Sequence, residues 1–178
     1  MPGISINGLP APLLGTTGSQ INFQIPFEVG PGTATVNLLA NGSSVGTASI
    51  QVQTAAPGLF TQSDGTAAVL NQDSSVNGAA NPAVSGSVIA AYLTGLGSVQ
   101  PPVATGKSAP LDSLSTTTGG VTATVGGATA TVEFAGLAPG YTGLYQVNVL
   151  VPQLPSGRTP LQTSVNGVAS NAADVNLR

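Results

Sequence analysis

The chain has 178 residues, of which 41% are hydrophobic and only 5% charged, and it has a formal net charge of −3 with neither cysteine nor histidine. Three cationic residues, Lys107, Arg158 and Arg178, are too few for the basic surface that binds nucleic acid or docks on anionic membranes. The missing residue types exclude catalytic triads, thiol nucleophiles, and thiolate or imidazole metal sites. No apolar run is long enough to insert into a membrane, and we expect no cofactor.

The composition predicts a folded all-β protein. Twenty-four glycines and 14 prolines punctuate the chain, while the helix-supporting residues Glu, Lys and Arg are nearly missing. Val, Ile and Thr, which favour strands, are abundant. A positive mean hydropathy with little net charge is also atypical of disordered chains.

The first informative strands lie in residues 20–39, QINFQIPFEVGPGTATVNLL, which have the pattern of two strands joined by a Pro-Gly turn. Ile21, Phe23 and Ile25 alternate there with polar residues, of which Gln24 is one. This period of two predicts a buried face that carries the three apolar side chains and a solvated face that carries Gln24.

A long segment without a counterpart near the N-terminus follows at residues 60–122. Within it Val88–Leu93 is apolar on both faces, which predicts a central strand. The sequence QDSSVN at 72–77 has the composition of a polar turn. Residues 98–120 are rich in Pro, Ser and Thr and are predicted to form a loop.

The last strands begin at Tyr145, where Tyr145, Val147, Val149 and Val151 alternate with mostly polar residues. Tyr145 stands two residues before inward-facing Val147, which is the place of the tyrosine corner in immunoglobulin-like sandwiches. A simple role as core filler fits the same position, and the sequence leaves both open.

Three blocks of sequence recur in the same order, which predicts a tandem repeat. Both copies of the third block contain Asn-Gly at the same offset, at 41–42 and 166–167, where a two-residue type I′ hairpin is expected. The matched pairs are ISINGLPAPLL (4–14) with ATVGGATATVEF (123–134), SQINFQIP (19–26) with YQVNVLVP (145–152), and ANGSSVGTASIQV (40–52) with VNGVASNAADVNL (165–177).

The predicted fold is therefore all-β, with tandem immunoglobulin-like antiparallel β-sandwiches of which the first is incomplete. We expect a partial sandwich at residues 1–54, a short linker at 55–59 and a complete sandwich at 60–178. The apolar face of the partial sandwich, marked by Ile21, Phe23 and Ile25, needs a cover. A longer parent protein, the second domain, or a strand donated by a neighbouring copy are the three solutions.

The chain resembles a C-terminal domain family of uncharacterised role described from Solibacter-type Acidobacteria. The stretches that carry the resemblance include INGLPAPLL, QINFQIPFEVGPGTATV, AVLNQDSSVNGAANPAVSGSVIAAYLTGLG and GLAPGYTGLYQVNVLVP, and the similarity spans nearly the whole chain. It implies a tandem of immunoglobulin-like folds at the C-terminus of a large secreted or surface protein. Members usually continue upstream of ISINGLPAP with a further Gly-rich strand region, and no activity or binding residue comes with the family.

The candidates for chemistry are few. The carboxylates lie far apart, since no two fall within five residues of each other. Asp73, in NQDSSVN, fits a turn better than a calcium loop, and Lys107, in ATGKSAP, fits a solvated loop. Phe27 and Tyr141, both in or near loops, are the candidate exposed rings for a ligand such as a polysaccharide, with core or hinge packing as the alternative.

The sequence thus predicts a non-enzymatic, extracellular or cell-surface module with a structural or adhesive role. Its low charge favours self-association, and a homo-oligomer or a filament completed by strand donation is the sharper form of the prediction. Neighbouring domains of a parent protein are the other expected partners. The alternative is a carbohydrate- or protein-binding module of a larger secreted protein.

Overall fold

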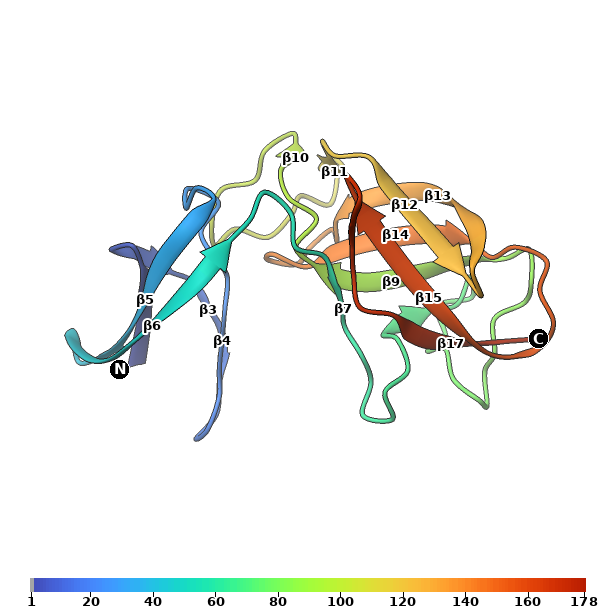
Figure 1. Ribbon diagram of the computed structural model, residues 1–178, viewed down its shortest axis with the longest axis horizontal. Coiled ribbons are helices and arrows are strands. Elements are labelled where there is room, and N and C mark those ends of the chain that lie inside the picture. Colours follow the sequence, from blue (N-terminus) through green and yellow to red (C-terminus); the bar gives the residue numbers. More distant parts are fainter. Residues whose placement is uncertain (1) are drawn as a thin grey trace.

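The computed structural model describes residues 2–178, which form strands and loops without any helix, so the all-β prediction is confirmed. None of the described residues belongs to a helix that could cross a bilayer. The strands divide into two groups around two separate hydrophobic clusters (Figure 1). We name residues 2–52 the first unit and residues 58–177 the second unit.

The first unit is a small sandwich of a four-stranded sheet and a two-stranded hairpin. The sheet has the order β2-β1-β5-β6, and the hairpin is β3-β4. Its core is thin, because only Ile4, Ile6, Ala11, Val29 and Ala34 are buried. The strands are β1 (Pro2–Ile6), β2 (Leu9–Ala11), β3 (Leu13–Thr16), β4 (Ile21–Phe23), β5 (Gly32–Ala40) and β6 (Ser43–Val52).

The second unit is larger, and its strands follow the order β16-β15-β12-β13-β14-β9-β7, with β8, β10, β11 and β17 paired at the sides. The strands are β7 (Gly58–Leu59), β8 (Val69–Leu70), β9 (Val88–Thr94), β10 (Val99–Gln100), β11 (Thr116–Thr117), β12 (Val121–Val125), β13 (Ala128–Leu137), β14 (Tyr145–Leu150), β15 (Gly157–Val165), β16 (Val168–Ala169) and β17 (Ala173–Leu177).

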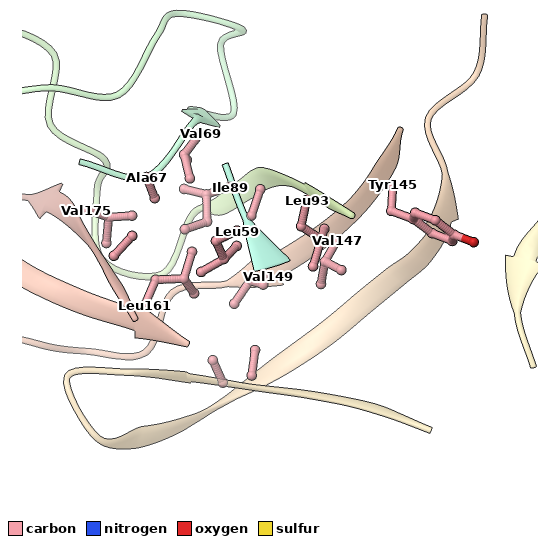
Figure 2. Packing of buried hydrophobic residues seen from close by; sticks show 14 of the residues in the cluster. Leu59, Ala67, Val69, Ile89, Leu93, Tyr145, Val147, Val149, Leu161 and Val175 are labelled. Carbon is pink, nitrogen blue, oxygen red and sulfur yellow. The ribbon is translucent and has the colours of Figure 1, made fainter. Parts of the chain in front are cut away.

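Strand β13 joins the two layers of the second unit. Its first residues pair with β12 and its later ones with β14, and the register shifts between Val132 and Phe134. Side chains from both layers meet in one core, where Ile89, Val147 and Leu161 are fully buried (Figure 2). The predicted architecture of two antiparallel immunoglobulin-like sandwiches, with the first incomplete, is confirmed.

The local predictions that rest on short-range chemistry are confirmed. Asn41-Gly42 and Asn166-Gly167 connect paired strands with positive φ at both residues, as a type I′ hairpin requires. Asn7-Gly8 forms the same kind of connection between β1 and β2. Val88–Leu93 lies in β9, which pairs with β14 on one edge and with β7 and β8 on the other, and is therefore central.

The predicted alternation fails after Phe23. Strand β4 ends there, Gln24 is only 7% exposed and Ile25 is 41% exposed, so the inward and outward positions are exchanged. The reason is that the chain leaves the strand pattern: Gln24 donates its backbone N–H to Pro12 O, and its side chain turns toward the second unit. Ile21, Phe23 and Ile25 therefore do not form one continuous row.

The matched blocks of sequence form strands with like neighbours. β1 pairs with β2 and β5, and β12 pairs with β13 and β15. β4 pairs with β3, which follows β2, while β14 pairs with the later part of β13. One partner differs, because β14 also pairs with β9, whereas β4 pairs with no second strand of the described chain.

Candidate functional site

The junction between the two units contains the best-defined polar contact between them. The side chain of Gln24 is buried, and its Oε1 accepts a hydrogen bond of 2.8 Å from the backbone N–H of Gly106. On its other side lies Gly143, where an added Cβ would come within 3.3 Å of Gln24 Cγ. The loop that carries Gly106 and the loop before β14 thus hold one glutamine of the first unit between them.

Thr105 makes the second contact across this junction. Its Oγ1 accepts a hydrogen bond of 3.0 Å from the Phe27 N–H and donates one of 2.7 Å to Glu28 Oε2. The hydrogen bond from Thr105, followed by a backbone hydrogen bond within Glu28, lowers the pKa of the Glu28 carboxyl below its ordinary value. One hydroxyl therefore bridges two residues of the first unit that are adjacent in sequence.

The linker between the units is held by a third contact. Ala56 N–H donates a hydrogen bond of 2.9 Å to Gly95 O, in the loop that follows β9. Gly95 has a φ of 77°, and a Cβ added there would lie 1.9 Å from Ala56 O. Only glycine allows the linker to approach this loop so closely.

Tyr145 fixes the same loop from inside the second unit. Its hydroxyl donates a hydrogen bond to Gly97 O, and its ring lies at the end of the core (Figure 2). Burial raises the pKa of Tyr145 to about 12. The partner lies 48 residues away in sequence, so the contact is not the tyrosine corner, which bonds to backbone a few residues upstream. Nor is Tyr145 a simple core filler, because its hydroxyl has a specific acceptor.

The two candidate ligand aromatics are both exposed. Phe27 is 42% exposed and lies at the junction beside Thr105, whereas Tyr141 is 60% exposed in the loop before β14. Tyr141 O accepts a hydrogen bond from the Ala109 N–H. Burial first, and then the proximity of Tyr141, raises the pKa of Tyr92, which places Tyr141 near Tyr92.

The predicted strand-acceptor residues are placed differently from one another. Ile21 and Phe23 lie in β4, are half-buried and pack against the small core of the first unit. Ile25 lies beyond the strand and is exposed. The structure thus brings Ile21 and Phe23 together and leaves Ile25 apart from them.

Asp73 and Lys107 occupy ordinary surface positions. Asp73 Oδ1 accepts hydrogen bonds from the N–H and the hydroxyl of Ser75, at 3.0 and 2.6 Å, which lower the pKa of Asp73 and fix a turn. Lys107 is exposed. In residues 2–178 no three or more carboxylates gather where they could hold a metal ion.

Asn77 is a buried residue that sequence reasoning assigned to a turn. Its Nδ2 donates to Asn176 O at 2.9 Å, and its Oδ1 accepts from the Asn176 N–H at 2.8 Å. Asn71 Oδ1 accepts the second proton of the same Nδ2. The side chain thereby replaces a strand partner for β17 and ties residues 60–85 to the rest of the second unit.

The surface hollows are shallow and lie away from the candidate aromatics. One of about 250 Å³ is lined by Glu133, Phe134 and neighbouring residues of β11 to β13, and one of about 240 Å³ by residues around Gly86 and Gln153. Neither includes Phe27 or Tyr141. Neither of these two hollows therefore supports a ligand pocket at the residues that the sequence singled out.

No protein-family model and no curated protein matches the chain. Among solved structures, domains 4 and 5 of the S-layer protein SbsC are similar, with 20% identity and a TM-score of 0.28 over 83% of this chain and 65% of that chain. A glycosyl hydrolase family 2 member from Bacteroides cellulosilyticus has 14% identity and a TM-score of 0.29, covering 99% of this chain and 21% of that one. A beta-glycosidase from Bacteroides vulgatus has 12% identity and a TM-score of 0.30, also with 99% and 21% covered. The chain thus spans less than two thirds of the length of the S-layer structure and about a fifth of the length of each glycosidase. TM-scores this low carry no inference about function.

Proposed function

We propose that this chain is a non-enzymatic structural module of a larger extracellular protein, and that it holds two β-sandwich units at a set distance and angle. The observation that supports this best is the buried Gln24, whose side chain bonds across the junction to Gly106. A flexible connection between independent domains needs no buried polar contact and usually avoids one, because an unpaired buried amide is costly.

The three contacts at the junction come from two loops of the second unit. Gln24 contacts Gly106, Thr105 contacts Phe27 and Glu28, and the linker residue Ala56 contacts Gly95. Two loops of the second unit are thus bonded to the first unit and to the linker, which restricts the rotation of one unit against the other. The proposed role is therefore that of a spacer with a defined bend.

The chemistry of the chain supports a role without catalysis. Histidine and cysteine are absent from the sequence, Asp64 and Asp73 accept hydrogen bonds within turns, and Glu28 accepts one from Thr105 at the junction. The ion pair between Arg158 and Asp174, 2.8 Å long, is exposed on β15 and β17. These groups fix local backbone and leave no poised acid and base.

The extracellular location is part of the proposal. It rests on the sparse charge, on the surface rich in Thr, Asn and Gly, and on the resemblance to C-terminal domains of secreted or surface proteins noted above. The tandem repeat is supported by the like strand neighbours of the matched blocks.

The filament form of the hypothesis receives less support. A filament completed by strand donation requires every copy to offer a free strand as well as a free edge. In the described chain, each strand of five or more residues already has a pairing partner. We therefore propose a module joined to neighbouring domains, and self-association at low charge stays a prediction.

Small-angle X-ray scattering of the full chain tests the spacer role. We expect a single, narrow distribution of distances between the units that matches the structure, and a broader one for the double variant Gln24→Ala/Thr105→Ala with both units still folded by circular dichroism. A wild-type distribution as broad as that of the variant contradicts the proposal. The matched control is Gln20→Ala, since Gln20 is exposed and its side chain bonds only to Asn22.

A carbohydrate-binding role is the second candidate, and the exposure of Tyr141 near Tyr92 favours it. Exposed tyrosine rings are common sugar platforms because sugars stack on their apolar faces. A glycan array checks this role: binding that is lost in Tyr141→Ala and kept in Phe60→Ala supports it, and the lack of any bound glycan contradicts it.

A further inference from the structure

Strand β14 of the second unit has a neighbouring strand on each of its two edges, whereas β4 of the first unit has a neighbouring strand on only one edge. β14 lies between β13 and β9, whereas β4 pairs with β3 alone among the described strands. The two strands lie in matching sequences, residues 19–26 and 145–152, which share Gln, Asn and Pro at equivalent positions. The edge of β4 that corresponds to the β9 edge of β14 is open.

The backbone direction of the two strands agrees with this correspondence. In the first unit, Gln20 O and Gln24 N–H bond toward the β3 side, so that the N–H and C=O groups of Ile21 and Phe23, at the alternate positions, point to the open edge. In the second unit, the backbone of Val151 bonds to Gly86 and Ser87, which lie just before β9. Val147, Val149 and Val151 therefore point their backbone groups toward β9, and Ile21, Phe23 and Ile25 are their equivalents.

Burial of the equivalent side chains shows what the missing neighbour would change. Val147 and Val149 are fully buried, and β9 lies directly beside them. Their equivalents, Ile21 and Phe23, are only half-buried although they pack on the small core. An apolar strand on the open edge would complete the burial of these two side chains.

The side chains that a strand on the open edge of β4 needs can be inferred from β9, which fills the equivalent place beside β14. In β9, Ile89, Ala91 and Leu93 face the core and are fully buried, while Val88, Ala90 and Tyr92 are half-buried on the other face. Ala91 lies opposite Val147, and Ile89 lies opposite Val149. A strand of this kind, placed on β4, brings its Ala91 position opposite Ile21 and its Ile89 position opposite Phe23.

We propose that the open edge of β4 binds an antiparallel strand supplied by another polypeptide, with uncharged apolar side chains on both faces as in β9. A second copy of this chain is a poor source, because its own β9 is held between β14 on one edge and β7 and β8 on the other. The strand that binds this edge is thus expected to come from a different protein. This inference is independent of the proposed spacer role, which concerns the junction.

A synthetic peptide of residues 86–94, GSVIAAYLT, with lysines added at both ends for solubility, tests the proposal on the full chain. Amide hydrogen exchange is measured residue by residue with and without peptide. We expect exchange at Ile21 and Phe23 to slow by at least about tenfold, since new hydrogen bonds protect both amides. A peptide with Ile89→Asp and Leu93→Asp is expected to bind at least about tenfold more weakly, because its core-facing side chains become charged.

The matched control peptide carries Val88→Thr, which keeps the β-branched shape on the outward face and is expected to bind as well as the parent peptide. Three results overturn the proposal. One is unchanged exchange at Ile21 and Phe23 with the parent peptide. Another is slowed exchange around Val147 and Val149 alone, which means that the peptide replaces β9. The third is a dimer of the chain without peptide in which Ile21 and Phe23 are already protected, which makes a second copy the occupant.

Discussion

The side chain of Gln24 and the backbone of Gly106 belong to different units and are joined by a hydrogen bond of 2.8 Å. Gln24 is buried, so water does not compete for its amide. The glutamine thus determines how the first unit meets the loop between β10 and β11, and its loss leaves Gly106 N–H without its acceptor.

Replacement of Gln24 by leucine is expected to lower the free energy of unfolding by about 1–3 kcal/mol, because a donor at the junction loses its acceptor. Urea unfolding measures the change. Gln20→Leu is the control, because Gln20 is exposed, and it is expected to change the value by less than about 0.5 kcal/mol. Equal effects of the two substitutions would show that the junction bond contributes nothing.

Gly95→Ala is expected to be among the most destabilising single changes in the chain. The φ of 77° is unfavourable for alanine, and the new Cβ would lie 1.9 Å from Ala56 O, so the linker must move. We expect a loss of at least about 2 kcal/mol, measured by thermal unfolding. Gly18→Ala is the control, since a Cβ there meets nothing within 4 Å, and a similar loss for Gly18→Ala contradicts the explanation.

Tyr145 gives the fold a pH dependence at alkaline pH. Burial raises its pKa from 10.0 to about 12 in the folded chain, so the stability associated with the neutral phenol is fully present below pH 10 and is lost as the pH rises through 12. The rise of the Tyr145 pKa from 10.0 to about 12 corresponds to about 2–3 kcal/mol of unfolding free energy. In Tyr145→Phe, which cannot ionise, the decline of stability between pH 10 and 12 should be much smaller. An unchanged decline would assign it to other groups, of which half-buried Tyr92, with its raised pKa, is the first to test.

Thr105→Val is expected to raise the pKa of Glu28 toward its ordinary value. The largest cause of the lowered pKa is the hydrogen bond from Thr105, which valine cannot make. NMR titration of the Glu28 carboxyl measures the change, with Asp64 as an internal control, because its pKa is lowered mainly by Thr66. A Glu28 pKa that stays low in the variant would show that its own backbone hydrogen bond is sufficient.

Asn77→Ala is expected to cost at least about 2 kcal/mol of unfolding free energy, because the Asn176 N–H loses its acceptor and the Asn176 carbonyl keeps only the hydrogen bond from the Ala83 N–H. Denaturant unfolding measures the loss. Asn37→Ala in β5 serves as the control, since the Asn37 side chain makes no hydrogen bond in the described structure, and it should change stability by about 0.5 kcal/mol or less. A small effect at Asn77 would mean that water replaces its amide.

The parts of the fold that local chemistry specifies could be predicted from the sequence. Asn41-Gly42 and Asn166-Gly167 adopt the hairpin geometry that positive φ requires, and Val88–Leu93 is central because it is apolar on both faces. The alternating apolar residues that follow Tyr145 also predict its position at the start of a core strand. Each of these properties depends on residues that are close together in sequence.

The features that could not be predicted depend on partners far along the chain. The alternation around Gln24 indicated a solvated side chain, but its partner Gly106 lies 82 residues away. The Asn77 side chain, in a segment with the composition of a turn, bonds to backbone 99 residues away. Periodicity describes which face of a strand is apolar, but it carries no information about which loop will later cover a polar residue.

The ion pair between Arg158 and Asp174 is exposed, and hydrogen bonds and apolar contacts hold the rest of the described chain. Dissolved salt screens exposed charges and leaves buried amides and aliphatic side chains largely unaffected. The same shape should therefore persist in fresh water and in brine.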